Sequence, residues 1–147
     1  MTVNTIRETV TPPEVPGGPV IAGQRRKRAL VVDDNLDSRV LVSLFLRKFE
    51  FDIAEAGNGQ EAFNLFRQQR FDVVVTDLQM PVMDGLTLMG KIKAVSRKTP
   101  VVVMTGCGAE NVQQLVGMTA AADVLHKPFG FGRFKDAIET LFNSRLF

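Results

Sequence analysis

The chain has very few of the side chains that carry sulfur and imidazole chemistry. Its 147 residues include one cysteine, Cys107, one histidine, His126, and neither tryptophan nor tyrosine. A single cysteine cannot form an intramolecular disulfide and is typical of a reducing compartment, so we expect a cytoplasmic protein. One cysteine and one histidine also cannot supply the cluster of sulfur and nitrogen ligands that binds zinc.

Long apolar runs are absent as well. The longest, such as VVVM at residues 101–104, fall far short of the roughly 20 residues that a membrane-spanning helix needs. The N-terminus has no apolar stretch of the kind found in secretory signals. We therefore expect no insertion into a membrane. The 11 phenylalanines are the only aromatic residues, so they must provide most of the large core side chains.

Basic residues are concentrated at the N-terminus. Residues 1–28 hold five basic and two acidic side chains, whereas the other 119 residues hold 13 basic and 14 acidic ones. The body of the protein is thus nearly neutral, and we expect no direct binding of nucleic acid by it.

The first 28 residues also differ from the remainder in composition. Four prolines and three glycines precede Arg25, without helical or strand periodicity, which predicts a flexible leader. The leader ends in the basic run RRKR at residues 25–28. Two interpretations of this run stay open: a solvated flank, or a contact with a phosphate, a membrane surface or a partner. Residues 29–147 are expected to form one domain.

Five predicted strands alternate with five predicted helices. The strands are expected at residues 29–32, 51–56, 72–76, 100–105 and 123–127. The helices are expected to about residue 49, at 60–69, 85–95 and 109–119, and around Phe134 to Phe142. Since parallel neighbours need crossover helices, this alternation predicts an α/β protein with a doubly wound parallel sheet.

The first predicted helix has a clear start. Asn35 or Asp37 can cap its N-terminus. The residues at helical spacing that support it are Val40, Leu41, Leu44, Phe45 and Lys48.

Polar side chains end several of the predicted strands. They are Asp33, Asp34, Asp77, Thr105 and Lys127. Each alone has an ordinary explanation, such as a strand-end cap for Thr105 or a solvated flank for Lys127. Because ligand sites in such sheets form beyond the carboxyl ends of the strands, their joint occurrence predicts a functional site.

The adjacent carboxylates in LVVDDN, residues 30–35, indicate what that site binds. Clustered carboxylates raise one another's pKa values unless a cation lies among them. A hard divalent ion with oxygen ligands fits, and Mg²⁺ is the best candidate. A carboxylate beside Mg²⁺, with a lysine and a hydroxyl group nearby, can accept a phosphoryl group.

The motifs of this site resemble those of the receiver domain of bacterial two-component response regulators. They are LVVDDN, VTDLQMPVMDG, VVMTG and HKPF. The resemblance covers residues 29–147 and is to stand-alone members similar to chemotaxis regulators. It implies a flavodoxin-like (βα)5 fold with one five-stranded sheet in the order 2-1-3-4-5.

The resemblance also implies a role for each site residue. Asp77 would accept a phosphoryl group from a phosphohistidine on a sensor histidine kinase or a phosphotransfer protein. Asp34 would bind Mg²⁺ directly, Asp33 largely through water, and Asp77 and the backbone carbonyl of Gln79 would complete the protein ligands. Lys127 would pair with the phosphoryl group.

Further implied features concern the switch and its surroundings. Thr105 would move toward the phosphoryl group, Pro128 would follow a cis peptide bond, and Gly85 would allow a sharp turn into the third helix. Many receivers have an aromatic residue three positions before the lysine, where this chain has Val124. We therefore hypothesise that the switch operates without the usual aromatic partner.

The resemblance implies output by contact, because no further domain follows residue 147. The expected surface comprises the helix at 109–119, the last strand and the last helix, and would bind a target or form a homodimer. Phe131, Phe142 and Phe147 are candidates for apolar area there, with core packing as the alternative for Phe142. The chain could equally be a phosphorelay intermediate or a piece of a longer protein.

Two other functions were weighed against the phosphoacceptor. An aspartate-nucleophile phosphohydrolase would place a second aspartate two residues after Asp77, where this chain has Gln79. A binding domain with a silent site would not need the complete acidic set. We therefore expect a signalling module that assists its own phosphorylation and dephosphorylation, rather than a turnover enzyme.

Overall fold

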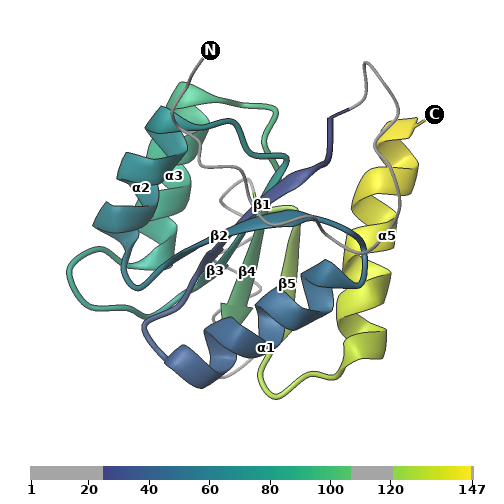
Figure 1. Cartoon of the computed structure of the whole chain (residues 1–147). Helices are drawn as coiled ribbons and strands as arrows, with labels where there is room; N and C mark the ends of the chain where they lie inside the picture. The colour runs from purple at the N-terminus through teal and green to yellow at the C-terminus, as the bar shows by residue number, and fades with distance from the viewer. Residues whose placement is uncertain (1–24, 107–120, 147) are drawn as a thin grey trace, which may run out of the picture.

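The computed structural model describes residues 25–106 and 121–146 and contains one parallel sheet (Figure 1). Its strands are β1 (Arg28–Val32), β2 (Asp52–Ala56), β3 (Val73–Asp77), β4 (Val101–Thr105) and β5 (Asp123–His126). They pair in the order β2-β1-β3-β4-β5, and every pairing is parallel. The predicted fold class and strand order are confirmed.

Helices cover both faces of the sheet. They are α1 (Leu36–Arg47), α2 (Gly59–Gln68), α3 (Gly85–Val95) and α5 (Phe131–Leu146). Figure 1 shows α2 and α3 on one side of the sheet, and α1 and α5 on the other. The helix predicted at residues 109–119 lies outside the described residues. None of the described helices has both the length and the apolar character to cross a bilayer.

Side-chain caps explain where three of the helices begin. Asn35 accepts a hydrogen bond from the backbone N–H of Ser38 at 2.9 Å, so the first of the two predicted caps is the one used. Asn58 and Asp84 cap α2 and α3 in the same way. Each such cap contributes about 1 kcal/mol to helix stability.

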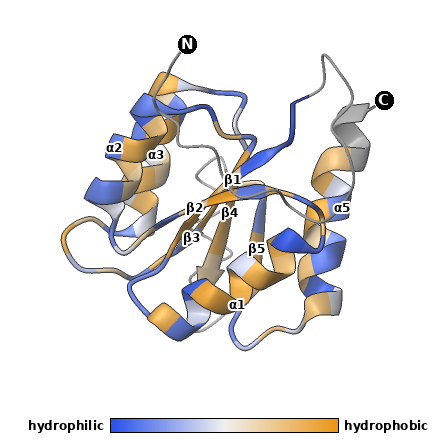
Figure 2. Ribbon diagram, viewed as in Figure 1, coloured by the Kyte–Doolittle hydropathy of each residue, from blue (hydrophilic) through white to orange (hydrophobic). Residues whose placement is uncertain are grey.

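The core lies in two layers on either side of a fully buried sheet centre. All five residues of β3 and of β4 are buried, as expected for parallel strands covered on both faces. Leu88 and Ile92 fill the layer under α2 and α3, and Leu46 and Phe134 fill the layer under α1 and α5. In Figure 2 the strands of the sheet are correspondingly hydrophobic.

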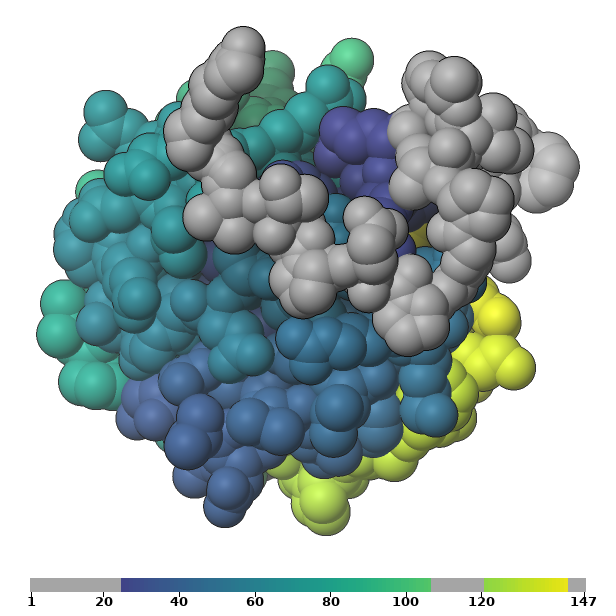
Figure 3. Space-filling model, in the orientation of Figure 1, coloured from purple at the N-terminus to yellow at the C-terminus, as the bar shows by residue number. Residues whose placement is uncertain are grey.

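Only some of the apolar residues of α1 face the core. Val40, Leu41 and Leu44 are 43%, 43% and 50% exposed, whereas Val42 and Leu46 are buried. Apolar residues occupy two overlapping stripes of this helix, and only one stripe can face the sheet. The other, which also includes Leu36, gives α1 an exposed apolar face made of Leu36, Val40, Leu41 and Leu44. Figure 3 shows α1, in blue, along the lower surface beside α5, in yellow-green.

Two phenylalanines of α5 pack within the domain, which is the alternative expected for Phe142. The Phe131 ring packs edge-on to Phe45, with 5.3 Å between centroids, and Phe142 lies 5.6 Å from Phe51. Both residues are partly buried, because α5 turns this side toward α1 and the start of β2. Phe147 lies outside the described residues.

The basic run at residues 25–28 contacts the N-terminal ends of neighbouring strands. Arg25 pairs with Asp72 at 3.3 Å, and Arg26 pairs with Asp52 at 3.3 Å. The backbone N–H of Arg28 donates to Asp72 at 2.8 Å. Three members of the run therefore connect the start of β1 to β2 and to the turn before β3.

Candidate functional site

The polar residues at the strand ends converge at the carboxyl edge of the sheet. Asp33 follows β1, Asp77 ends β3, and Lys127 follows β5. Because β1 and β3 pair with Val32 opposite Thr76, the residues that follow them are neighbours. Carboxylate oxygens of Asp33, Asp34 and Asp77 lie within 4.8 Å of one another, close enough to share one metal ion.

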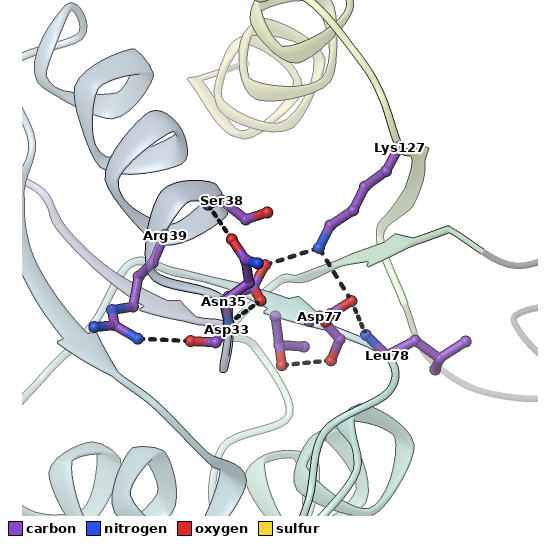
Figure 4. Close-up of polar contacts among 8 residues, drawn as sticks. Asp33, Asn35, Ser38, Arg39, Asp77, Leu78 and Lys127 are labelled. Carbon is purple, nitrogen blue, oxygen red and sulfur yellow. Dashed lines mark hydrogen bonds and ion pairs between the residues drawn. The ribbon is translucent and has the colours of Figure 1, made fainter.

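Lys127 bridges two of the three carboxylates (Figure 4). Its Nζ donates to Oδ2 of Asp33 at 2.9 Å and lies 3.5 Å from Oδ1 of Asp77. The other oxygen of Asp33, which is fully buried, accepts from the backbone N–H of Asn35 at 2.9 Å. Asp34 is exposed, and no basic group of residues 25–106 or 121–146 pairs with it.

The environment shifts the pKa of Asp77 upward. Burial of the carboxylate is the largest cause, and the charge of Asp33 adds to it. The charge of Lys127 and the backbone N–H of Leu78, which donates to Oδ1 at 3.0 Å, oppose the rise without cancelling it. The Asp77 carboxylate therefore lies where an additional cation would be favourable.

Lys127 has a raised pKa for a different balance of causes. Burial alone would lower it, but the hydrogen bond to Asp33 and the charges of Asp77 and Asp33 outweigh burial. The ammonium group is thus held in its charged form, ready to pair with an anion.

Thr105 and Gln79 lie at the margin of this cluster. Thr105 ends β4 and is buried, and its backbone carbonyl accepts from the N–H of Lys127 at 2.7 Å. Its predecessor, Met104, pairs with Asp77 in the sheet. Gln79 is exposed in the loop after Asp77. The structure therefore brings the three aspartates and Lys127 together, with Thr105 on the adjacent strand end.

Two backbone features fix the loops around the site. A Cβ atom on Gly85 would overlap the backbone carbonyl oxygen of Asp77, so this close approach requires glycine. The Lys127–Pro128 peptide bond is cis, as the resemblance implied.

Comparison with known proteins identifies the family. The response regulator receiver domain family matches residues 29–139, which is most of the chain. The chain belongs to this family. Receiver domains are signalling modules rather than turnover enzymes, and this receiver is accordingly a phosphoacceptor signalling module of two-component systems.

The share of the relative's length that this receiver covers differs from one relative to another. It is 31% identical to the probable chemotaxis protein CheY of Rhizobium etli over 120 residues, covering 80% of this chain and 93% of the relative. It is 33% identical to the transcriptional regulatory protein ZraR of Escherichia coli (strain K12) over 110 residues, covering 75% of this chain. The chain spans only about a quarter of ZraR's length, 25%.

A solved structure supports the same family. The response regulator protein TrrA of Thermotoga maritima, in complex with Mg²⁺-BeF, is 30% identical and superposes with a TM-score of 0.71. The match covers 78% of this chain and 98% of that one.

Sequence reasoning missed one contact beside the acidic cluster of this receiver. Nη1 of Arg39, on α1, donates to the backbone carbonyl of Asp33 at 2.8 Å, and its Nε donates to Glu55 of β2 at 2.9 Å. Ser43 donates to the other oxygen of Glu55 at 3.1 Å. Nothing in the local sequence announces this cluster, because its members come from two elements that meet only in the fold.

An apolar groove adjoins the site between α1 and the loop before α5. Its volume is about 380 Å³, and it is lined by Ser38, Leu41, Val42, Met104, Lys127, Pro128 and Phe129. Lys127 therefore faces both the acidic cluster and this groove, which makes the groove continuous with the site.

Proposed function

We propose that Asp77 is the residue of this receiver domain that accepts the phosphoryl group. The observation that carries the proposal is the position of Asp77, within 4.8 Å of the acidic pair and 3.5 Å from Lys127. Leu78 N–H and Lys127 both approach Oδ1, which leaves Oδ2 as the attacking oxygen. In the transfer, this oxygen forms a bond to phosphorus as the bond from phosphorus to the donor imidazole breaks.

The residues around Asp77 suit the metal that this chemistry requires. Asp34 is exposed and has no ion-pair partner among residues 25–106 and 121–146, so we assign it as a direct ligand of Mg²⁺, together with Asp77 and the backbone carbonyl of Gln79. Both oxygens of Asp33 already accept hydrogen bonds, which supports a role through water. When bound, Mg²⁺ neutralises charge on the phosphoryl oxygens.

Lys127 and Thr105 complete the assignment. The ammonium group of Lys127 lies next to the acceptor and would pair with an added phosphoryl oxygen. The Thr105 hydroxyl would donate to another. Gln79, in place of a second aspartate, argues against a phosphohydrolase.

The protein that donates the phosphoryl group would be a histidine kinase or phosphotransfer protein in the cytoplasm. We assign its docking surface to the exposed apolar face of α1 and the adjoining groove. This assignment rests on continuity, since Lys127 lines the groove and contacts the acceptor. A donor that brings its imidazole to Asp77 must lie against this rim.

The output surface is proposed on the family resemblance alone. It comprises residues 109–119, β5 and α5, and would bind a downstream protein or a second copy of the chain. Val124 is buried in the core layer under α2 and α3, without an aromatic ring to exchange between pocket and solvent. A structure with a phosphoryl mimic should therefore show no large inward movement of a ring such as Phe129.

Intact-mass measurement tests the acceptor directly. Incubation with acetyl phosphate and Mg²⁺ should add about 80 Da, one phosphoryl group, in a labile linkage. Asp77→Asn should abolish the adduct. Asp84→Asn is the matched control, because asparagine also caps α3 there. An adduct that survives in Asp77→Asn, or a wild type that gains none, would contradict the assignment.

A further inference from the structure

A partly exposed ion pair lies directly beside the acidic cluster without belonging to it. Arg39 and Glu55 are 2.9 Å apart, and the same guanidinium donates to the carbonyl of the peptide bond that joins Asp33 to Asp34 (Figure 4). If the Arg39 guanidinium could move to Asp34, it would compete with Mg²⁺ for that carboxylate. Guanidinium groups bind carboxylates bidentately, and Asp34, one residue after the contacted carbonyl, has no ion-pair partner in the described part of the chain.

We propose that Glu55 is a positioning residue for the metal site, which holds Arg39 on the Asp33 carbonyl and keeps its charge away from Asp34. The inference rests on the proposed function, because it concerns the Mg²⁺ site of the phosphoacceptor. In this arrangement the Arg39 guanidinium is bound to the Asp33 carbonyl, and Glu55 neutralises its charge.

The way Glu55 is held supports a positioning role. Ser43 is buried and donates to Oε2 of Glu55, while Arg39 occupies Oε1. Arg39 and Ser43 lie one helical turn apart on α1, so the carboxylate of Glu55 is fixed from two points. Arg39 and Glu55 are both partly buried, with side chains 19% and 33% exposed, which further limits their movement.

A double-mutant cycle, in which the Mg²⁺ dissociation constant is measured, tests the proposal. Mg²⁺ is titrated into ¹⁵N-labelled wild type, Glu55→Gln, Arg39→Gln and the double variant, and amide shifts around residues 33–34 give the dissociation constant. An uncompensated unit charge within a Debye length of a divalent ion weakens its binding several-fold, so Glu55→Gln should raise the constant about threefold to tenfold at low salt. Arg39→Gln leaves the Glu55 carboxylate uncompensated and should lower the constant, whereas the double variant should stay within about twofold of wild type.

The Mg²⁺ dissociation constants of the single and double variants distinguish a positioning role of Glu55 from a purely structural role. If the pair were only structural, the double variant would bind Mg²⁺ as weakly as Glu55→Gln or more weakly, and Arg39→Gln would be impaired too. Either result overturns the proposal, as does Glu55→Gln with wild-type affinity. If Glu55→Gln fails to fold, Ser43→Ala replaces it, with a smaller loss of affinity expected and an unchanged affinity contradicting the proposal.

Asp123→Asn is the matched control. It also removes one carboxylate from an ion pair, since Asp123 lies 3.0 Å from Arg133, but at the N-terminal end of β5. Its Mg²⁺ affinity should equal that of wild type. Failure of the proposed function has a different signature: the wild type itself would not bind Mg²⁺ or gain a phosphoryl group.

Discussion

The two glycines of α3 give opposite predictions for the same substitution. A Cβ atom on Gly85 would overlap the carbonyl oxygen of Asp77 and lie 3.0 Å from Cα of Leu78 and 3.1 Å from the carbonyl carbon of Asp77. All three are backbone atoms, so no side chain can rotate away to make room. A Cβ atom on Gly90, one and a half turns along the helix, would meet nothing within 4 Å.

The magnitudes follow from this difference. Alanine is the better helix former by about 1 kcal/mol, so Gly90→Ala should stabilise the receiver by roughly that amount. Gly85→Ala gains the same helix preference but must displace the backbone of Asp77, and overpacking of this kind costs about 1–3 kcal/mol or more. Because the helix gain is common to both variants, we expect Gly85→Ala to be less stable than Gly90→Ala by the overpacking cost, about 1–3 kcal/mol or more.

Urea unfolding followed by circular dichroism measures both effects, because the chain has no tryptophan for a fluorescence assay. Gly85→Ala should also accept a phosphoryl group from acetyl phosphate more slowly than wild type, since the displaced backbone carries Asp77, the proposed acceptor. Equal stability of the two variants, within about 0.5 kcal/mol, would refute the reasoning.

Three further predictions concern the acceptor, the loop beside it and the donor surface. Burial, with the charge of Asp33, raises the pKa of Asp77, so the folded state holds this proton more tightly than the unfolded state. Ionisation of Asp77 therefore lowers stability as the pH rises through the raised pKa. Asp77→Asn should be more stable than wild type at neutral pH without Mg²⁺, and urea unfolding should show the gap closing below the ordinary carboxyl pKa of about 4. Val82 has φ of 72° and is 81% exposed, so Val82→Asn should raise stability by about 1 kcal/mol, whereas Val95→Asn, on an exposed helical site, should not. Leu41→Glu should slow phosphoryl transfer from a histidine kinase that acts on the wild type, whereas transfer from acetyl phosphate should be unaffected. Val95→Glu is the control. If Leu41→Glu slowed transfer from both donors equally, the proposed docking surface would be contradicted.

Local sequence patterns were sufficient for helices with a clear cap and for strands that are buried on both faces. The helix predicted at 85–95 is found as Gly85–Val95, because Asp84 caps it and the residues after Val95 break its period. The buried strands were found from their short apolar runs, since both of their faces are covered. The strand order, by contrast, came from the family resemblance, because periodicity does not say which strands are neighbours.

Sequence patterns were insufficient where the local sequence fits two arrangements of a segment equally well. Both stripes of α1 are apolar, and the inner one is decided by Phe134 and Phe131, which lie more than 80 positions further along the chain and pack against Phe45. The basic run at residues 25–28 looked like a solvated flank or a partner contact because its carboxylate partners lie at residues 52 and 72. Such choices depend on contacts between distant segments, which no local spacing encodes.

Charge balance links the acidic pair, the lysine and the neighbouring ion pair into one scheme. With all three carboxylates ionised, the single ammonium group of Lys127 leaves the cluster with two excess negative charges, the charge that one Mg²⁺ ion balances. Arg39 and Glu55 add no net charge as long as both are present. Without Glu55, the uncompensated charge of Arg39 would reduce the excess negative charge of the region from two to one, and this positive charge would lie beside Asp34. An arginine can therefore lie next to a metal site without weakening it, provided that its own carboxylate partner is held as firmly as Ser43 holds Glu55.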